Sequence, residues 1–90
     1  MTSGPSQNEV IEFPSDHVFK AVGDNRAGFV FSVHRAVSSV VPAPLDALKT
    51  RESAGGKYIS VSVVVRLDNR DQLERIYESL KQIEGVRYLL

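Results

Sequence analysis

The clearest pattern in the chain is an alternation of apolar and polar residues over positions 57–67, KYISVSVVVRL. A period of two is typical of a β-strand that buries one face and leaves the other in water. The residues expected to point into a core are Ile59, Val61, Val63, Val65 and Leu67. The residues expected to point away are Tyr58, Ser60, Ser62, Val64 and Arg66.

A shorter alternation over residues 17–23, HVFKAVG, predicts a second strand. Phe19 and Ala21 share one face of it, and Lys20 lies on the other. Residues 45–53 can continue as a helical turn or pair as a strand. We favour an edge strand, because residues 54–56 (AGG) form a turn that leads into the long strand.

Residues 26–40 repeat apolar side chains every three or four positions, which is the pattern of a helix that packs one stripe on a core. Asn25 is the expected N-cap, and Pro42 and Pro44 end the helix. The stripe consists of Phe29, Val30, Val33, Val37 and Val40.

A second helix is predicted from the segment NRDQLERIYESLKQIEG, residues 69–85. Asn69 and Gln72 have the spacing of a capping box, and Gly85 fits the C′ position that favours a left-handed residue. Residues 86–90 form a last strand. The apolar stripe consists of Leu73, Ile76, Tyr77, Leu80 and Ile83.

The predicted order is strand, helix, strand, strand, helix, strand, which is the ferredoxin-like βαββαβ arrangement of the α+β class. We therefore expect a two-layer sandwich, with a four-stranded antiparallel sheet and both helices on one face. Residues 1–14 have little periodicity and are expected to be a mobile leader, held at its end by Ile11, Phe13 and Pro14. Residues 15–90 form the single domain.

Composition excludes several classes of function. The 90 residues carry 11 basic and 11 acidic side chains, so a broad basic field for nucleic acid is absent. There is no cysteine and there are only two histidines, which argues against a metal site, thiolate chemistry or a cofactor. No apolar run is long enough to span a membrane, and no signal peptide opens the sequence, so we expect a cytoplasmic protein.

Three segments of the chain resemble the YbeD-like family of small bacterial proteins of unknown function. They are residues 17–23 with Lys20 and Gly23, GKYISVSV at residues 56–63, and above all LERIYESLKQIEGVRYLL at residues 73–90. The resemblance covers roughly residues 11–90. It implies a fold similar to ACT domains, which are regulatory modules that bind amino acids or related effectors at a dimer interface.

The join of the first strand and first helix is similar to the ACT pattern of Asp or Asn followed by Arg-Pro-Gly and an apolar residue. Asn25, Arg26, Gly28 and Phe29 match this pattern, and Ala27 departs from it by replacing the proline. Glycine at a helix N-terminus lets a ligand approach the backbone, where free N–H groups favour a carboxylate. The alternative is that Gly28 only allows the helix to pack closely on the strand at residues 57–67.

Lys20, Ser60 and Ser62 share the outward face of the sheet and offer one cation and two hydroxyls to a polar ligand. The alternative is an ordinary solvated strand face. We expect the ligand, a small-molecule effector, to contact residues from both places. These residues are Lys20, Gly23, Asn25, Gly28, Ser60 and Ser62.

The main hypothesis is therefore a regulatory module that binds a small polar metabolite, with a homodimer implied by the resemblance. The alternative is a protein-interaction adaptor that uses the open sheet face or the edge strand at residues 45–53. RNA binding ranks lower, because GKYISVSV offers one aromatic ring where RNA-recognition strands carry several. We expect no enzyme, because no nucleophile is paired with a base, and the acidic residues near 68–78 alternate with cations as on an ordinary helix face.

Overall fold

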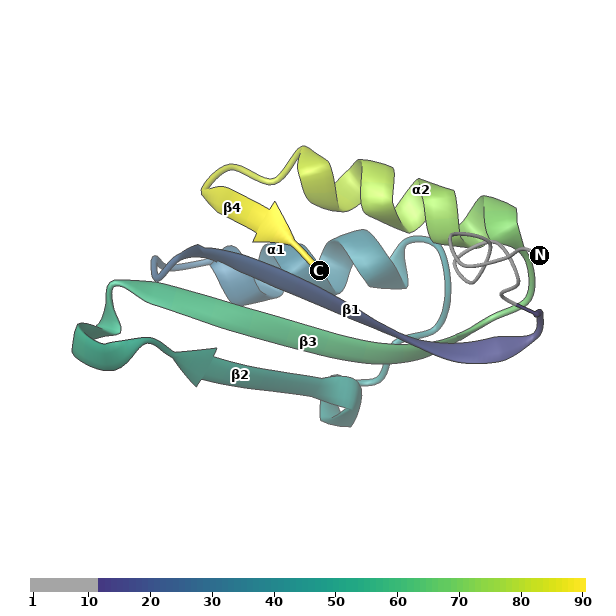
Figure 1. Ribbon diagram of the computed structural model, residues 1–90, viewed down its shortest axis with the longest axis horizontal. Coiled ribbons are helices and arrows are strands. Elements are labelled where there is room, and N and C mark those ends of the chain that lie inside the picture. Colours follow the sequence, from purple (N-terminus) through teal and green to yellow (C-terminus); the bar gives the residue numbers. More distant parts are fainter. Residues whose placement is uncertain (1–11) are drawn as a thin grey trace, which may run out of the picture.

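The computed structural model describes residues 12–90, and the predicted order of elements is confirmed. Strand β1 spans Ser15–Asp24, β2 Leu48–Glu52, β3 Tyr58–Leu67 and β4 Val86–Leu89. Helix α1 spans Phe29–Ser38 and α2 spans Arg70–Lys81 (Figure 1). Short 3-10 turns at Leu45–Ala47 and Ala54–Gly56 stand on either side of β2.

The four strands form one antiparallel sheet in the order β2-β3-β1-β4, so β2 is an edge strand as predicted. Strands β1 and β3 pair along their whole length, from Ser15 opposite Leu67 to Asp24 opposite Tyr58. This register places Lys20 opposite Ser62 on the face away from the core.

The core lies between the sheet and the two helices, which contact each other as well as β3. The alternation of β3 is confirmed, because all five residues predicted to point inward are buried. Val18 and Val64 lie on the other face with about half of their surface in solvent (52% and 47%). That face of the sheet carries no helix among the described residues.

Three local predictions about the first helix need correction. Helix α1 begins at Phe29, not at residue 26, and its N-cap is Gly28, not Asn25. Instead, the Asn25 side-chain amide donates to the carbonyl of Gly56 at 2.9 Å. The helix ends at Ser38, before the prolines, because the chain leaves through a turn in which the N–H groups of Val40 and Val41 bond to the carbonyl of Val37.

The cap of α2 was predicted correctly in part. The Asn69 side chain accepts from the N–H of Gln72 at 2.9 Å, as a capping residue does. Gln72 in turn accepts from the N–H of Asp68 rather than from that of Asn69. Gly85 has a φ of 93° as expected of a left-handed residue, but it lies in the turn from Ile83 to Val86 and not at C′.

The predicted leader falls mostly outside the described residues, which include neither its first ten positions nor Ile11. Phe13 is described and is partly buried against the core. Strand β1 extends the predicted strand by two residues at its start, to Ser15, and by one at its end, to Asp24.

Candidate ligand-binding site at the start of α1

The four residues from Arg26 to Phe29 form the turn that leads into α1. The N–H of Phe29 donates to the carbonyl of Arg26 at 3.2 Å, and Gly28 has φ 88° and ψ −11°. These are the angles of the third residue of a type II turn, a position that favours glycine. Proline is common at the second position of such a turn, which Ala27 occupies here.

Gly28 is therefore required by the backbone and not by close packing. A Cβ built on Gly28 meets no heavy atom within 4 Å, so the interpretation that this glycine lets α1 approach β3 is wrong. Because the residue is exposed and precedes the helix, it also carries none of the helix-interior penalty of glycine.

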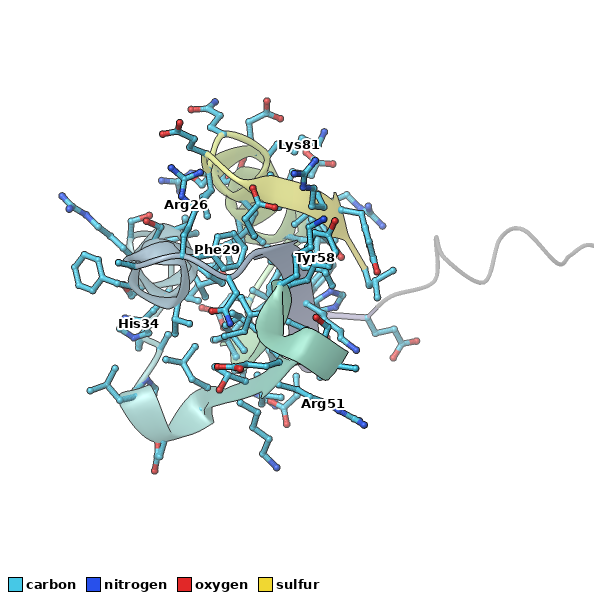
Figure 2. The ribbon with its side chains drawn as sticks, turned by 90° about the vertical axis from the view of Figure 1, so that its left-hand side faces the viewer. Arg26, Phe29, His34, Arg51, Tyr58 and Lys81 are labelled. Carbon is cyan, nitrogen blue, oxygen red and sulfur yellow. The ribbon has the colours of Figure 1, made fainter. Side chains whose placement is uncertain are left out.

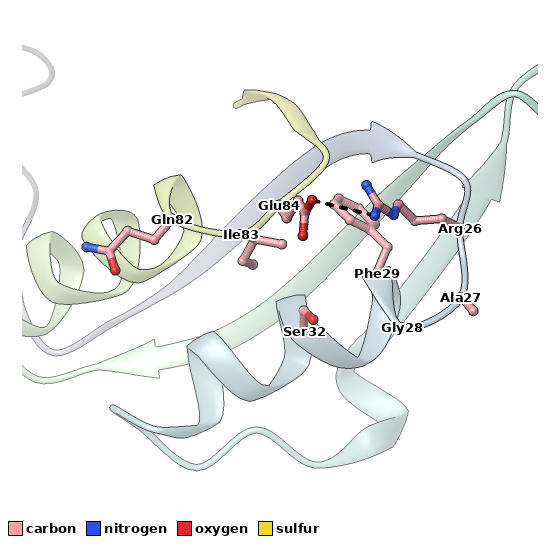
Figure 3. A pocket seen from close by; sticks show the side chains of 8 residues that line it. All are labelled: Arg26, Ala27, Gly28, Phe29, Ser32, Gln82, Ile83 and Glu84. Carbon is pink, nitrogen blue, oxygen red and sulfur yellow. Dashed lines mark ion pairs between the residues drawn. The ribbon is translucent and has the colours of Figure 1, made fainter.

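A cavity of about 360 Å³ opens beside this turn. Figure 3 shows that its wall comes from two segments far apart in the sequence: the start of α1 and the loop that follows α2. Its lining residues are Arg26, Ala27, Gly28, Phe29, Ser32, Gln82, Ile83 and Glu84.

Two opposite charges face each other at the mouth of this cavity. Arg26 Nη2 lies 3.8 Å from Glu84 Oε2, and the two side chains are 49% and 88% exposed. An exposed ion pair of this kind contributes only about 0–1 kcal/mol, so another charged group can replace it at small cost.

The N-terminus of α1 adds a positive potential to the same place. No side chain caps the helix, and its first turn contains no Asp or Glu. The first N–H groups of a helix have no carbonyl partner within the helix and carry a partial positive charge, which attracts anions. Together, Arg26 and this helix end suit a carboxylate, and Glu84 suits a cation.

Of the predicted site residues, Gly28 alone lines this cavity. Gly23 is buried beneath Phe29, and a Cβ added there would lie 2.4 Å from the ring carbon Cζ. Asn25 holds the β2–β3 hairpin, through its side chain to Gly56 and through its own N–H to the carbonyl of Lys57 at 3.0 Å.

Lys20, Ser60 and Ser62 lie together on the open face of the sheet, away from the cavity. Lys20 and Ser60 line a depression of about 210 Å³ that they share with Arg51 and two tyrosines, Tyr58 and Tyr88. The hydroxyl of Ser60 donates to the carbonyl of Arg51 at 3.4 Å. The six predicted residues therefore do not form one site.

Sequence reasoning did not assign Ser32, Gln82, Ile83 and Glu84 to the site. The signal for Arg26 was present, because the Asn-Arg-x-Gly pattern includes it. No signal within the sequence joins residues 82–84 to residues 26–32, since their contact depends on how the two helices lie on the sheet.

Arg87, on β4, forms an ion pair with the neighbouring strand β1. Its Nε donates to Asp24 Oδ1 at 2.9 Å, across the β1–β4 pair. The hydrogen bond to this carboxylate and its negative charge raise the pKa of the Arg87 guanidinium.

The two histidines do not form a catalytic arrangement. His17 packs on Phe19 with ring centroids 4.6 Å apart, and its Nε2 lies 3.5 Å from the Tyr77 hydroxyl. Burial lowers the pKa of His17 and raises that of Tyr77. His34 bonds to the carbonyl of Ala43.

Within residues 12–90, no cluster of three or more His, Asp or Glu side chains is placed to hold a metal ion. In the same part of the chain, no helix combines the length and the apolar character needed to cross a membrane.

Comparison with solved structures shows that the fold is ferredoxin-like and similar to that of an ACT domain. Protein HP0495 from H. pylori superimposes with a TM-score of 0.68 at 17% identity and covers 100% of this chain and 98% of its own. The ACT domain from GTP pyrophosphokinase of Chlorobium tepidum superimposes with a TM-score of 0.62 at 16% identity, over 83% of this chain and 84% of that domain. At these identities the likeness shows the fold alone.

The chain belongs to the family described as "Protein of unknown function (DUF493)", which it matches over residues 8–90. A UPF0250 protein of Shewanella loihica is 37% identical over 84 residues, 92% of this chain and 93% of the relative. A UPF0250 protein of Haemophilus influenzae strain Rd is 33% identical over 82 residues, 91% of this chain and 88% of the relative. These matches confirm the YbeD-like resemblance, and their names indicate no enzymatic reaction.

Proposed function

We propose that this protein is a regulatory module that binds a small carboxylate of the amino-acid class in the cavity between the start of α1 and the end of α2. The observation that carries this proposal is the pairing of Arg26 and Glu84 beside an uncapped helix N-terminus. The ligand carboxylate binds at the helix N-terminus and Arg26, and the ligand ammonium binds Glu84. An amino acid supplies both charges within one small molecule.

The Arg26–Glu84 pair favours a dipolar ligand over a simple anion. A ligand with only a carboxylate would draw Arg26 away from Glu84. The Glu84 carboxylate would then have no counter-charge. A zwitterion replaces the Arg26–Glu84 pair with two ion pairs, one to each residue. Its carboxylate also accepts hydrogen bonds from the helix N–H groups, and such bonds are stronger when the acceptor is charged.

The ACT-like fold supports the regulatory part of the proposal by analogy. The Chlorobium tepidum domain is, by its name, one part of a larger enzyme, so a domain of this fold can serve as a module. The resemblance also implies that the effector binds at a homodimer interface. Sedimentation of the protein with and without the amino acid would show whether it is a dimer and whether the amino acid changes its oligomeric state.

Titration of the ¹⁵N-labelled protein with pools of L-amino acids, followed by amide spectra, tests the site. We expect shifts at Gly28, Phe29, Ser32 and Glu84. Matched pools of amino-acid amides, which keep the ammonium and the side chain but lack the carboxylate charge, should produce none.

Variants of the ion pair make this test specific. Arg26→Gln and Glu84→Gln should each abolish the shifts, whereas Arg70→Gln, at the other end of α2, should keep them. If no pool shifts these amides, or if the shifts lie at Lys20 and Ser60 instead, the proposed site is wrong. Gly28→Val is a poor test, because its left-handed backbone strains any side chain.

A further inference from the structure

Strand β2 presents unpaired backbone groups at the edge of the sheet. Beyond its end, the N–H of Ser53 donates to the carbonyl of Tyr58 at 2.9 Å, and the N–H of Tyr58 donates to the Ser53 hydroxyl, so Ser53 faces β3. Hydrogen-bonded pairs alternate along an antiparallel ladder, so Arg51 is the next residue whose backbone points toward β3. The backbone N–H and C=O groups of Thr50 and Glu52 therefore point outward, where no strand covers them within residues 12–90.

Two side chains of this edge carry positive charge, and Asp46 and Glu52 carry negative charge in the same segment. Lys49 and Arg51 point to the open face of the sheet, opposite Ser62 and Ser60, and Figure 2 shows Arg51 on the side away from α1. Neither cation has an ion pair among the described residues, whereas the nearby Arg66 is paired with a carboxylate. Lys49 and Arg51 can therefore form ion pairs with acidic side chains of a partner.

An apolar hollow lies at the start of the same edge, on its helix side. Phe31 and Leu45 are 64% and 72% exposed, so both offer apolar surface to a partner. They line a cavity of about 410 Å³ together with Val30 and the half-buried Leu48, the first residue of β2.

A second copy of this chain does not fit the edge. Antiparallel pairing of two β2 strands about Thr50 would place Lys49 directly opposite Arg51 of the other copy, and pairing about Arg51 would place that residue opposite itself. Like charges directly opposite each other destabilise a strand pair. The occupant that the charges favour is an acidic segment of a different protein.

We propose that the β2 edge binds an extended acidic segment of a partner protein by antiparallel strand addition. From N-terminus to C-terminus, the partner segment has an acidic residue, a residue of any type, a second acidic residue and an apolar residue. The two carboxylates lie opposite Arg51 and Lys49, and the apolar side chain lies opposite Leu48 and enters the hollow beside Phe31. The hollow shares Arg26 and Gly28 with the α1 cavity, but the strand edge lies outside that cavity and the proposal does not rest on the proposed function.

The probe is a fluorescein-labelled peptide, acetyl-Ser-Lys-Glu-Thr-Glu-Leu-Thr-amide, and the measurement is fluorescence anisotropy against the full chain. Its lysine lies opposite Glu52, and its central threonine lies opposite Thr50. Replacing both peptide glutamates with lysine should weaken binding about tenfold or more, because two attractive pairs become repulsive. Equal affinity for the two peptides overturns the proposal.

N-methylation separates strand addition from simple charge attraction. Methylation of the central threonine removes the N–H that bonds to Thr50 and should abolish binding. Methylation of the second glutamate, whose N–H points away from β2, should leave binding unchanged. If both methylated peptides bind equally, the partner does not add as a strand.

Matched protein variants complete the test. The double variant Lys49→Glu, Arg51→Glu should lose the acidic peptide and gain the lysine peptide, while Lys81→Glu on α2 should behave as the unmodified protein. Thr50→Pro removes an outward N–H without touching the β3 ladder, so it should fold and still lose the peptide. If no acidic peptide binds, the two cations serve to block edge pairing, and the proposal is wrong.

Discussion

Two glycines flank the join of β1 and α1, and the surroundings of the two residues differ in every respect. Gly23 is buried, and an added Cβ would lie 2.4 Å from Cζ of Phe29 and 2.7 Å from the carbonyl oxygen of Gly85. Gly28 is exposed and has empty space around it, but its φ is 88°. The lack of a side chain at Gly23 leaves room for the ring of Phe29. The lack of a side chain at Gly28 allows a positive φ.

This difference shows why a glycine in a motif does not by itself identify a ligand site. Gly23 belongs to the YbeD-like segment at residues 17–23 and Gly28 to the ACT-like pattern at the join, and both were predicted to bind a ligand. The ring of Phe29 closes off Gly23, while Gly28 shapes the turn that presents the start of α1 to the cavity. Substitutions at the two positions should therefore fail for different reasons.

The largest effect is expected for Gly23→Ala. Its Cβ would overlap a buried ring and a backbone oxygen, and overpacking of this kind costs about 1–3 kcal/mol, occasionally more. Urea unfolding followed by circular dichroism measures the loss. A loss below that range would mean that Phe29 can shift freely.

The double variant Gly23→Ala, Phe29→Leu sharpens this prediction. If the ring is the main obstacle, its removal should recover part of the loss, so the two changes will not add. Strict additivity would assign the cost to the Gly85 carbonyl instead.

Gly28→Ala should have a smaller effect, about 1–2 kcal/mol, because the methyl group meets nothing and only the left-handed backbone is unfavourable. The same unfolding measurement applies. A larger residue, as in Gly28→Leu, should cost about as much, since the space is open. A steep dependence on side-chain size would contradict the backbone explanation.

Ala27→Pro is expected to stabilise the protein by about 0.4–1 kcal/mol. Position two of a type II turn suits proline, which reduces the freedom of the unfolded chain. The midpoint of urea unfolding should rise. A fall would mean that Ala27 does not have the backbone angles of that position.

The smallest effect concerns pH and a residue remote from both glycines. Burial lowers the pKa of His17 below 6.5, so the unfolded chain binds a proton more readily than the folded one. Stability should be complete above pH 6.5 and should fall as the pH drops through the lower pKa of the folded state. In His17→Gln this decline should flatten, as measured by unfolding at a series of pH values.

The extent to which the sequence was predictive varies along the chain. The alternation in β3 predicted every buried residue of that strand, because period two is a property of the strand alone. The start of α1 was placed too early, because Asn25 is a good N-cap in isolation, yet its side chain is held by Gly56 of a distant hairpin. The positive φ of Gly85 was predicted correctly, but its position in the turn was not. A left-handed glycine suits both the C′ position of a helix and the turn from Ile83 to Val86.

The candidate site divides in the same way. Gly28 and Arg26 were visible in the short pattern at the join, while Glu84 was not. Lys20, Ser60 and Ser62 were correctly placed on one sheet face by alternation, but the expectation that they share a site with Gly28 failed. Alternation specifies a face, and it does not specify what lies beside that face.

By itself, the sequence determined the helices and strands, their buried stripes and the family, because each depends on residues close together in the chain or on the whole pattern. Only the tertiary structure decided that Glu84 meets Arg26, that Phe29 covers Gly23, and that the cations of β2 stand at an unpaired edge. Those contacts depend on the strand order β2-β3-β1-β4 and on how the helices pack across it. Local periodicity carries no information about which distant segments become neighbours.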